Sequence, residues 1–316
     1  MLSERMHSQH PPGDVTVVLK RNSLPGLFVR RIDKANVRLD SNFASENSMT
    51  KSSLPPLSPV RAFGFRVNPG TIDDYLEFTG AAIAERRRTC LFDHNLHSLY
   101  LYFRDPGLHR LYEYATVMID GMPIVWLLRA AGYPVQRRHR ITWVDYIWPL
   151  LTCAEKNGWR VFYVGSSAET LEQGLQKIRA RLPQLKIAGH HGFFDTTPGS
   201  ADNARVVDAI NAFKSDLCIV GMGTPRQQYW IVSNRPYVEA PVMVFCGACM
   251  EYVAGTVSTP PRWTGRMGLE WAYRLFTNPR RFAIRYLVEP WALAAMLFTN
   301  GLRSTMRVPR GHIRRS

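Results

Sequence analysis

Short apolar runs alternate with longer amphipathic segments from about residue 60 onward. The clearest run, Leu217–Val220, has four consecutive apolar residues and ends at Gly221. A run this short and this apolar predicts a strand buried on both faces. The same pattern predicts strands at residues 89–92, 115–119, 159–164, 185–189 and 242–246. Helical spacing of apolar positions predicts helices between them, at residues 71–87, 99–114, 123–131, 169–182 and 204–213.

This alternation of strand and helix is typical of an α/β fold. We expect a Rossmann-like, mostly parallel sheet flanked by helices, with right-handed crossovers and a C-terminal basic helical appendage. The core should span residues 59–258 and the appendage residues 259–316. Residues 1–58 mix Ser, Pro, His and Asn with scattered charge and have no period. That composition predicts a poorly ordered leader.

Positive charge is concentrated in the appendage. The 316 residues include 40 Lys and Arg against 25 Asp and Glu, a formal charge of +15. Eleven arginines and only two acidic residues follow position 261. Such an excess predicts a polyanionic partner, which could be nucleic acid, an anionic membrane surface or a phosphorylated substrate.

Apolar residues in the appendage recur at helical spacing. Trp263, Met267, Trp271 and Leu275 follow one another at steps of four, which gives one apolar helix face. Two interpretations remain open: this face rests on an anionic bilayer, or it packs on the α/β core. No uninterrupted apolar run reaches the roughly 18 residues of a spanning helix. We therefore expect association with a membrane surface and no segment that crosses it.

The five cysteines do not form a recognisable metal or disulfide pattern. Cys246 and Cys249 form a Cys-x-x-Cys pair, but no second pair and no histidine pair completes a zinc site. We expect them to be small packing residues, with a redox or metal role as the alternative. An odd number of cysteines, without a signal peptide, favours a reducing cytosol.

Candidate ligand-binding residues follow the strand at 217–220. Gly221 and Gly223 would let the backbone approach a ligand, and Thr224 and Gln227 add polar side chains beyond them. In an open parallel sheet, ligands bind at the carboxyl ends of the strands, where helix N-termini attract anions. A nucleotide diphosphate would fit this place. An ordinary strand-to-helix turn remains the alternative, because a single Gly-x-Gly is a weak signal.

Asp120 ends another predicted strand and is followed by Gly121. This position puts a carboxylate at the rim of the expected crevice, where it could take a proton from a sugar hydroxyl. The alternative is that Asp120 caps the helix predicted at 123–131. The two interpretations are compatible.

Five blocks of the chain have a distinctive order and spacing. They are Asp120-Gly121-Met122-Pro123, Arg140-Ile141-Thr142 with Asp145, Tyr163-Val164-Gly165, Gly221 to Gln227, and Leu269-Glu270-Trp271 followed by Arg274, Pro279, Arg280, Arg281, Arg285 and Tyr286. Together they resemble the WecG/TagA/CpsF family of bacterial glycosyltransferases, which act in cell-envelope polysaccharide and teichoic acid assembly. The resemblance covers about residues 63–292.

The resemblance implies an inverting transfer of a sugar from a UDP-sugar to a polyprenyl-diphosphate-linked saccharide. It further implies a peripheral enzyme on the cytoplasmic face of the plasma membrane that needs neither a metal nor another cofactor. The donor sugar would be of the N-acetylmannosamine, N-acetylmannosaminuronic acid, glucose or glucuronic acid type. The sequence does not decide whether the protein forms a homo-oligomer.

The resemblance assigns roles to individual positions. Asp120 looks like the general base, and Gln227 matches a glutamine near the nucleotide-sugar. Asn95 matches the asparagine of a Thr-x-Asn motif, and Arg140 begins a segment of the Arg-Val-x-Gly-x-Asp type. The arginines expected to reach the diphosphate are Arg274, Arg281 and Arg285.

These roles agree with the chemistry of inverting transfer. One base must act on the acceptor hydroxyl, and the growing charge of the departing diphosphate must be stabilised. The chain contains no Asp-x-Asp, the carboxylate pattern expected of a divalent-metal clamp. Arginines can replace the metal because their fork geometry fits phosphate oxygens.

The chain departs from the family pattern at several positions. Asp93 stands at the threonine of Thr-x-Asn, Trp143 at the glycine of the arginine segment, and Gln228 at a common glutamate. Thr259-Pro260-Pro261 replaces an Arg-Ala-Pro. We expect these changes in the pocket wall, where they would alter which donor sugar is accepted.

Two other classes of protein remain as alternatives. A nucleic-acid-binding protein would fit the charge and the arginines interleaved with aromatic residues, but no nucleic-acid-binding motif is present, so we expect no nucleic acid partner. The second alternative is a basic membrane-surface or nucleotide-sugar-binding protein without transferase activity. The presence of Asp120 and Gln227 favours catalysis.

Overall fold

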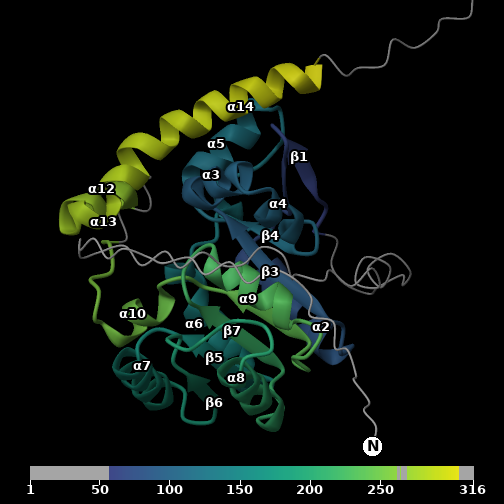
Figure 1. Cartoon of the computed structure of the whole chain (residues 1–316), viewed down its shortest axis with the longest axis vertical. Helices are drawn as coiled ribbons and strands as arrows, with labels where there is room; N and C mark the ends of the chain where they lie inside the picture. The colour runs from purple at the N-terminus through teal and green to yellow at the C-terminus, as the bar shows by residue number, and fades with distance from the viewer. Residues whose placement is uncertain (1–56, 262–263, 265–268, 306–316) are drawn as a thin grey trace, which may run out of the picture. The chain divides into compact units, whose positions relative to one another are not determined.

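The computed structural model describes residues 57–261, 264 and 269–305, except for the side chains of residues 281 and 300–305. The leader predicted at 1–58 therefore lies almost wholly outside the described residues. All described residues belong to one compact unit. Figure 1 shows that unit as a central sheet with helices around it and a long C-terminal helix at one end.

A six-stranded sheet forms the centre of the fold, and every pairing in it is parallel. This confirms the predicted Rossmann-like α/β class. The order across the sheet is β4-β3-β8-β7-β5-β6. The strands are β3 (Thr89–His94), β4 (Thr116–Ile119), β5 (Arg160–Gly165), β6 (Lys186–His190), β7 (Leu217–Gly221) and β8 (Val242–Phe245). A separate antiparallel hairpin joins β1 (Val60–Ala62) to β2 (Phe65–Val67).

Both faces of the sheet are buried, which explains the uninterrupted apolar runs. Side chains alternate between faces along a strand, so in β7 the residues Cys218 and Val220 enter one apolar cluster. Leu217 and Ile219 enter the cluster on the opposite face. Strand prediction from apolar runs succeeded here because parallel strands covered on both sides have no polar face.

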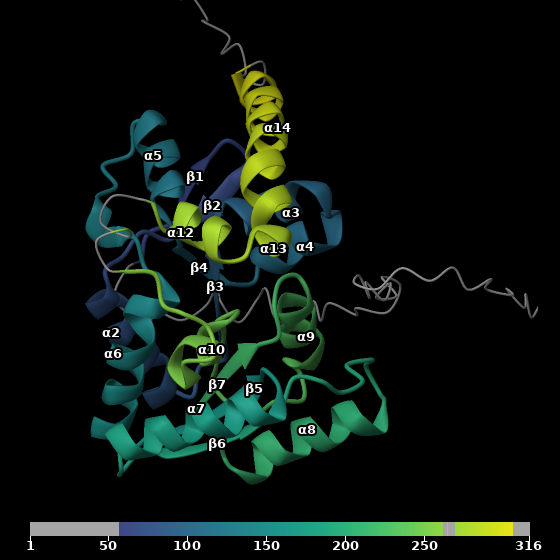
Figure 2. The same ribbon diagram turned by 90° about the vertical axis from the view of Figure 1, so that its left-hand side faces the viewer.

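Helices cover the two faces of the sheet in separate groups (Figures 1 and 2). Residues of α2, α6, α7 and α10 fill one cluster, and residues of α3, α4, α5, α8 and α9 fill the other. Their bounds are α2 (Ile72–Ala84), α3 (Leu96–Arg104), α4 (Pro106–Tyr112), α5 (Met122–Ala130), α6 (Trp143–Lys156), α7 (Ala168–Arg181), α8 (Ala201–Ala212), α9 (Arg226–Asn234) and α10 (Cys249–Ala254), with a short 3-10 helix η2 (Arg137–His139).

Three of these α-helices, α6, α9 and α10, were not among the helices predicted from the sequence. Pro149 lies inside α6, and an internal proline is evidence against a helix. Burial of Tyr146, Ile147, Leu150 and the neighbouring apolar residues against the sheet nevertheless stabilises this segment as a helix. Tertiary packing here overrides the local signal.

The C-terminal segment forms a chain of helices that packs against the core. It consists of α12 (Glu270–Thr277), α13 (Pro279–Ala283), the π-helix η3 (Ile284–Val288) and α14 (Glu289–Thr305). Figures 1 and 2 both show α14 alongside α3, and Leu293 and Leu297 of α14 belong to the buried cluster that contains α3. Of the predicted apolar helix face, Trp271 and Leu275 lie on α12, whereas Trp263 and Met267 lie outside the described residues.

No helix in the described part of the chain combines the length and the apolar character needed to cross a membrane.

Candidate active site

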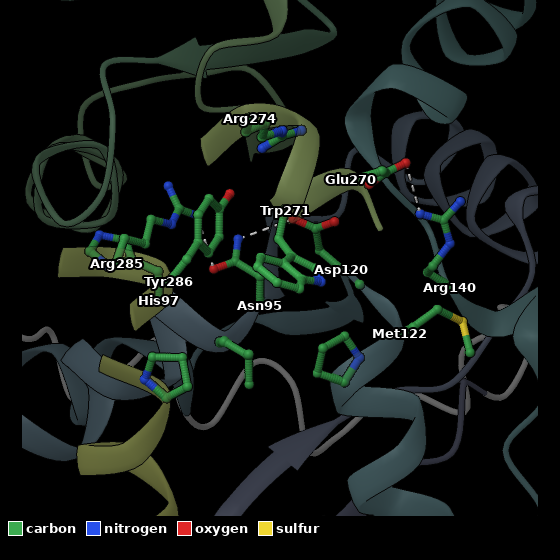
Figure 3. Close-up of a pocket in the computed structure, with 14 residues that line it drawn as sticks. Asn95, His97, Asp120, Met122, Arg140, Glu270, Trp271, Arg274, Arg285 and Tyr286 are labelled. Atoms are coloured by element: carbon green, nitrogen blue, oxygen red, sulfur yellow. Dashed lines mark hydrogen bonds and ion pairs between the residues drawn. The ribbon is translucent and has the colours of Figure 1, made fainter. Parts of the chain in front are cut away.

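Two adjoining cavities lie where the carboxyl ends of the strands meet the C-terminal helices. The larger has a volume of about 560 Å³ and the smaller about 300 Å³. Five residues line both: Asn95, His97, Asp120, Arg274 and Arg285. Figure 3 shows side chains of the C-terminal helices facing those of the α/β core across the smaller cavity. The sheet and the appendage thus contribute to one site.

Asp120 follows β4 directly, and its position is fixed by the neighbouring strand. Its backbone N–H donates to the carbonyl oxygen of His94 at 2.9 Å, and its Oδ2 accepts a hydrogen bond from Asn95 Nδ2 at 3.0 Å (Figure 3). The N-cap of α5 is Gly121, and α5 has no side-chain cap. The interpretation of Asp120 as a helix cap is therefore wrong. Its carboxylate faces the two cavities instead.

Asn95 has two tasks. It is the N-cap of α3, where its Oδ1 accepts a hydrogen bond from Ser98 N at 3.0 Å, as expected of an asparagine at this position. Its amide nitrogen then holds Asp120. Because the cap fixes the Asn95 rotamer, the amide N–H points at one carboxylate oxygen of Asp120 and leaves the other available. The helix start orients the candidate base in this way.

The turn from β7 to α9 supplies the next part of the wall. Gly223, Thr224 and Gln227 all line the larger cavity. Gln227 is buried, and its Oε1 accepts hydrogen bonds from the backbone N–H groups of Gly223 (3.2 Å) and Gly247 (3.3 Å). It thereby ties this turn to the one after β8. Gly223 has a φ of +79°, a conformation that glycine adopts without strain.

Gly221, in contrast, lines neither cavity. A Cβ atom at this position would lie 2.0 Å from Tyr163 Oη and 2.9 Å from the carbonyl oxygen of Gly247. The first glycine is therefore needed because neighbouring groups approach the backbone closely. The observed geometry gives it a packing role, and the ligand-facing part of the turn begins at Gly223.

Three of the four predicted arginines reach the site with described side chains. Arg140 donates to Asp145 Oδ2 at 3.1 Å and to Glu270 Oε1 at 3.4 Å, so it links the core to α12. Arg274 and Arg285 come from the C-terminal helices, and Arg285 Nη2 donates to Asn95 Oδ1 at 3.5 Å. The fourth, Arg281, belongs to α13, but its side chain lies outside the described residues.

Arg274 keeps its charge in a crowded environment. Burial disfavours the charged guanidinium, but four neighbouring groups outweigh that effect and raise its pKa above the usual value. These groups are Tyr252, Tyr286, Asp120 and Glu270. Its Nε is buried without a hydrogen-bond partner among the described residues. A permanently charged group with an unused donor is suited to an anionic ligand.

The structure adds site residues that the sequence analysis missed. His97 lines both cavities, and its Nδ1 lies 2.6 Å from Glu289 Oε2 of α14. Trp271 and Tyr286 line the smaller cavity. His97 had no sequence signal because its partner lies 192 residues away along the chain. Its position two residues after Asn95 was the one available hint.

The departures from the family pattern do not all lie in the cavity wall. Asp93 and Trp143 line the larger cavity. Gln228 is fully buried and lines neither cavity. Residues 259–261 do not line either cavity. The expectation that all of these changes fall in the pocket wall is therefore wrong for Gln228 and for residues 259–261.

Metal-ligand side chains do not gather among the described residues, where no group of three or more His, Cys, Asp or Glu could hold an ion. Cys246 and Cys249 are both buried in the same apolar cluster, which agrees with the packing interpretation. Of the carboxylates that line the cavities, Asp120 is the one that lines both, as do Arg274 and Arg285.

A parallel α/β sheet with a cavity at its carboxyl ends, a positioned carboxylate and arginines in the cavity wall is suited to binding an anionic ligand. Comparison with known proteins identifies the group. The model of the glycosyl transferase WecG/TagA/CpsF family matches residues 60–307. The chain belongs to this family and is a glycosyltransferase, as the sequence motifs predicted.

Related proteins include the N-acetylglucosaminyldiphosphoundecaprenol N-acetyl-beta-D-mannosaminyltransferases of Staphylococcus aureus strains NCTC 8325 / PS 47, COL and MRSA252. Each is 26% identical to this chain over 231 residues, which cover 68% of this chain and 88% of the relative.

Proposed function

We propose that the protein transfers a sugar from a UDP-sugar to a polyprenyl-diphosphate-linked saccharide, with inversion at the anomeric carbon. The observation that carries this proposal is that Asp120, Arg274 and Arg285 share the walls of both cavities. A base and a pair of cations on one cavity are what inverting transfer with a diphosphate leaving group requires.

In the proposed reaction, Asp120 takes the proton of an acceptor hydroxyl. The hydroxyl oxygen forms a bond to the anomeric carbon of the donor while the bond from that carbon to the UDP oxygen breaks. UDP leaves with the bonding electrons. Arg274 and Arg285 stabilise the charge that grows on the diphosphate, so the reaction needs no divalent cation.

The cavities also suggest how donor and acceptor divide the site. The larger cavity includes the Gly223–Gln227 turn, which suits the nucleotide-sugar. The smaller cavity shares Leu96, Pro123 and Pro290 with an apolar groove between α3, α5 and α14. That groove suits the polyprenyl chain of an acceptor. The relatives named above act on undecaprenyl-diphosphate-linked N-acetylglucosamine, which supports an acceptor of this class.

The first experiment measures UDP release by the purified full chain with a panel of UDP-sugars. The panel holds N-acetylmannosamine, its uronic acid, glucose and glucuronic acid, each with a polyprenyl-diphosphate-sugar acceptor and with or without EDTA. We expect acceptor-dependent release from one donor, unchanged by EDTA. Release abolished by EDTA would contradict the role of the arginines. No release from any donor would contradict the transferase function.

We further propose that the C-terminal helices rest on an anionic bilayer surface. They carry large apolar side chains that are wholly or partly exposed: Trp271, Phe276, Ile284, Leu287, Val288, Trp291 and Phe298. Arginines on the same helices would attract anionic headgroups while these side chains enter the interfacial layer.

The double variant Phe276→Ser/Trp291→Ser tests this membrane contact. Both side chains are exposed, at 84% and 77%, and neither lines the cavities. We expect partitioning into anionic vesicles to fall by about tenfold or more, because each large apolar side chain that enters an apolar phase contributes about 1.5–3 kcal/mol. The measurement is vesicle co-sedimentation, and Phe193→Ser, which changes an exposed aromatic residue of the core, is the control. Equal partitioning of all three proteins would refute the contact.

A further inference from the structure

Three positions at which the chain departs from the family pattern belong to one buried hydrogen-bond network. Trp143 Nε1 donates to Asp93 Oδ2 at 3.2 Å. Gln228 Nε2 lies 3.3 Å from the hydroxyl of Tyr112, and that hydroxyl donates to the backbone carbonyl of Asp93 at 3.0 Å. Asp93 is thus held from two sides. Trp143 bonds the carboxyl group of Asp93, and Gln228 acts through Tyr112 on its backbone carbonyl.

The carboxyl of Asp93 is buried but not fully satisfied. Its residue is 3% exposed and lines the larger cavity. Oδ2 accepts the indole N–H of Trp143, while Oδ1 makes no hydrogen bond within the described part of the chain. Oδ1 is not among the side-chain atoms that are buried without a hydrogen-bond partner, so it remains accessible from this cavity. An atom in this position at a cavity wall is suited to a polar group of a ligand.

The protonation of Asp93 differs from that of a surface aspartate. Burial and the nearby charge of Asp120 raise the pKa of its carboxyl well above the usual value, while the Trp143 hydrogen bond and the charge of Arg285 act in the opposite direction. The carboxyl therefore keeps its proton to a higher pH. A protonated carboxyl both donates and accepts hydrogen bonds, which matches the needs of a sugar hydroxyl.

We propose that Asp93, positioned by Trp143, hydrogen-bonds a hydroxyl of the transferred sugar and thereby determines which UDP-sugar the enzyme accepts. This inference rests on the proposed transferase function. The donor sugar is favoured over the acceptor because Asp93 lines only the cavity that contains Thr224 and Gln227. Asp120 lies between the two cavities, so Asp93 meets the sugar on the donor side of the base.

The test combines changes in the enzyme with changes in the donor. It uses the full chain, the best UDP-sugar of the panel and its monodeoxy analogues, and it measures kcat/KM for wild type, Asp93→Asn and Asp93→Ala. For wild type, we expect one deoxy position to lower kcat/KM on the order of 10- to 100-fold. Asp93→Ala should lose a similar factor with the intact donor and show almost no further loss with that one analogue, because both changes remove the same hydrogen bond.

Asp93→Asn should lose less kcat/KM than Asp93→Ala, since an amide, like a protonated carboxyl, can both donate and accept hydrogen bonds. Trp143→Phe, which removes only the indole N–H from an aromatic side chain, should weaken the same deoxy discrimination. Trp148→Phe is its matched control, because Trp148 lies on the same helix, contacts Arg181 and lines neither cavity.

The outcomes separate this inference from the transferase proposal. If wild type turns over a donor and Asp93→Ala lowers kcat/KM by one common factor for that donor and all its deoxy analogues, the specificity role is wrong and the transferase function stands. If wild type turns over no UDP-sugar, the transferase proposal itself fails. Loss of deoxy discrimination at a single position in Asp93→Ala and Trp143→Phe, but not in Trp148→Phe, supports the inference.

Discussion

Asp120→Asn is expected to lower turnover by about 10³-fold, within the range that a positioned general base contributes, while binding of UDP is retained. Asparagine has the same shape as aspartate, and Asn95 can still donate to its oxygen as it does to Asp120 Oδ2. The variant therefore removes the basicity and keeps the geometry. Acceptor-dependent UDP release measures the loss, and calorimetric titration with UDP measures the retained binding.

Asp73→Asn is the control for this change, because Asp73 is an exposed aspartate in the first turn of α2. It should have wild-type turnover. Wild-type turnover by Asp120→Asn would refute the base, and the hydrogen bond from Asn95 would then have only a structural purpose. Loss of UDP binding together with turnover would point to a role in holding the donor.

The sheet was predictable because its strands are buried on both faces. All six predicted strands exist, with ends shifted by a few residues; β3, for example, runs on through Asp93 and His94. Those two residues are polar, so an apolar run alone could not include them. They are buried because their partners come from distant segments, such as Trp143 for Asp93.

The site residues that directly follow a strand of the sheet were predictable. Asp120 and the Gly223–Gln227 turn lie at the carboxyl edge because all parallel strands end there. Contacts that depend on how the C-terminal helices pack could not be predicted, since they join residues far apart in the sequence. Arg140 with Glu270 and His97 with Glu289 are of this kind. Gly221 shows the converse: its motif was recognised, but its packing against Tyr163 was visible only in three dimensions.

Arg274 should have the second-largest effect on catalysis. It lines both cavities beside Asp120, and its unused Nε donor faces no described partner. Arg274→Gln removes the charge, and we expect kcat to fall by about 10²- to 10³-fold, as for the loss of one group that stabilises transition-state charge. Binding of UDP should weaken as well, because the product carries the same diphosphate.

Arg274→Lys separates charge from geometry. A lysine keeps the positive charge but lacks the planar fork that grips two phosphate oxygens, so its activity should lie between those of wild type and Arg274→Gln. Arg280→Gln is the control, since Arg280 is exposed on α13 and lines neither cavity. Equal activity of Arg274→Gln and Arg280→Gln would show that Arg274 does not stabilise the leaving group. If activity instead decreases in the order wild type, Arg274→Lys, Arg274→Gln, the C-terminal helices are part of the catalytic site, because Arg274 lies on α12.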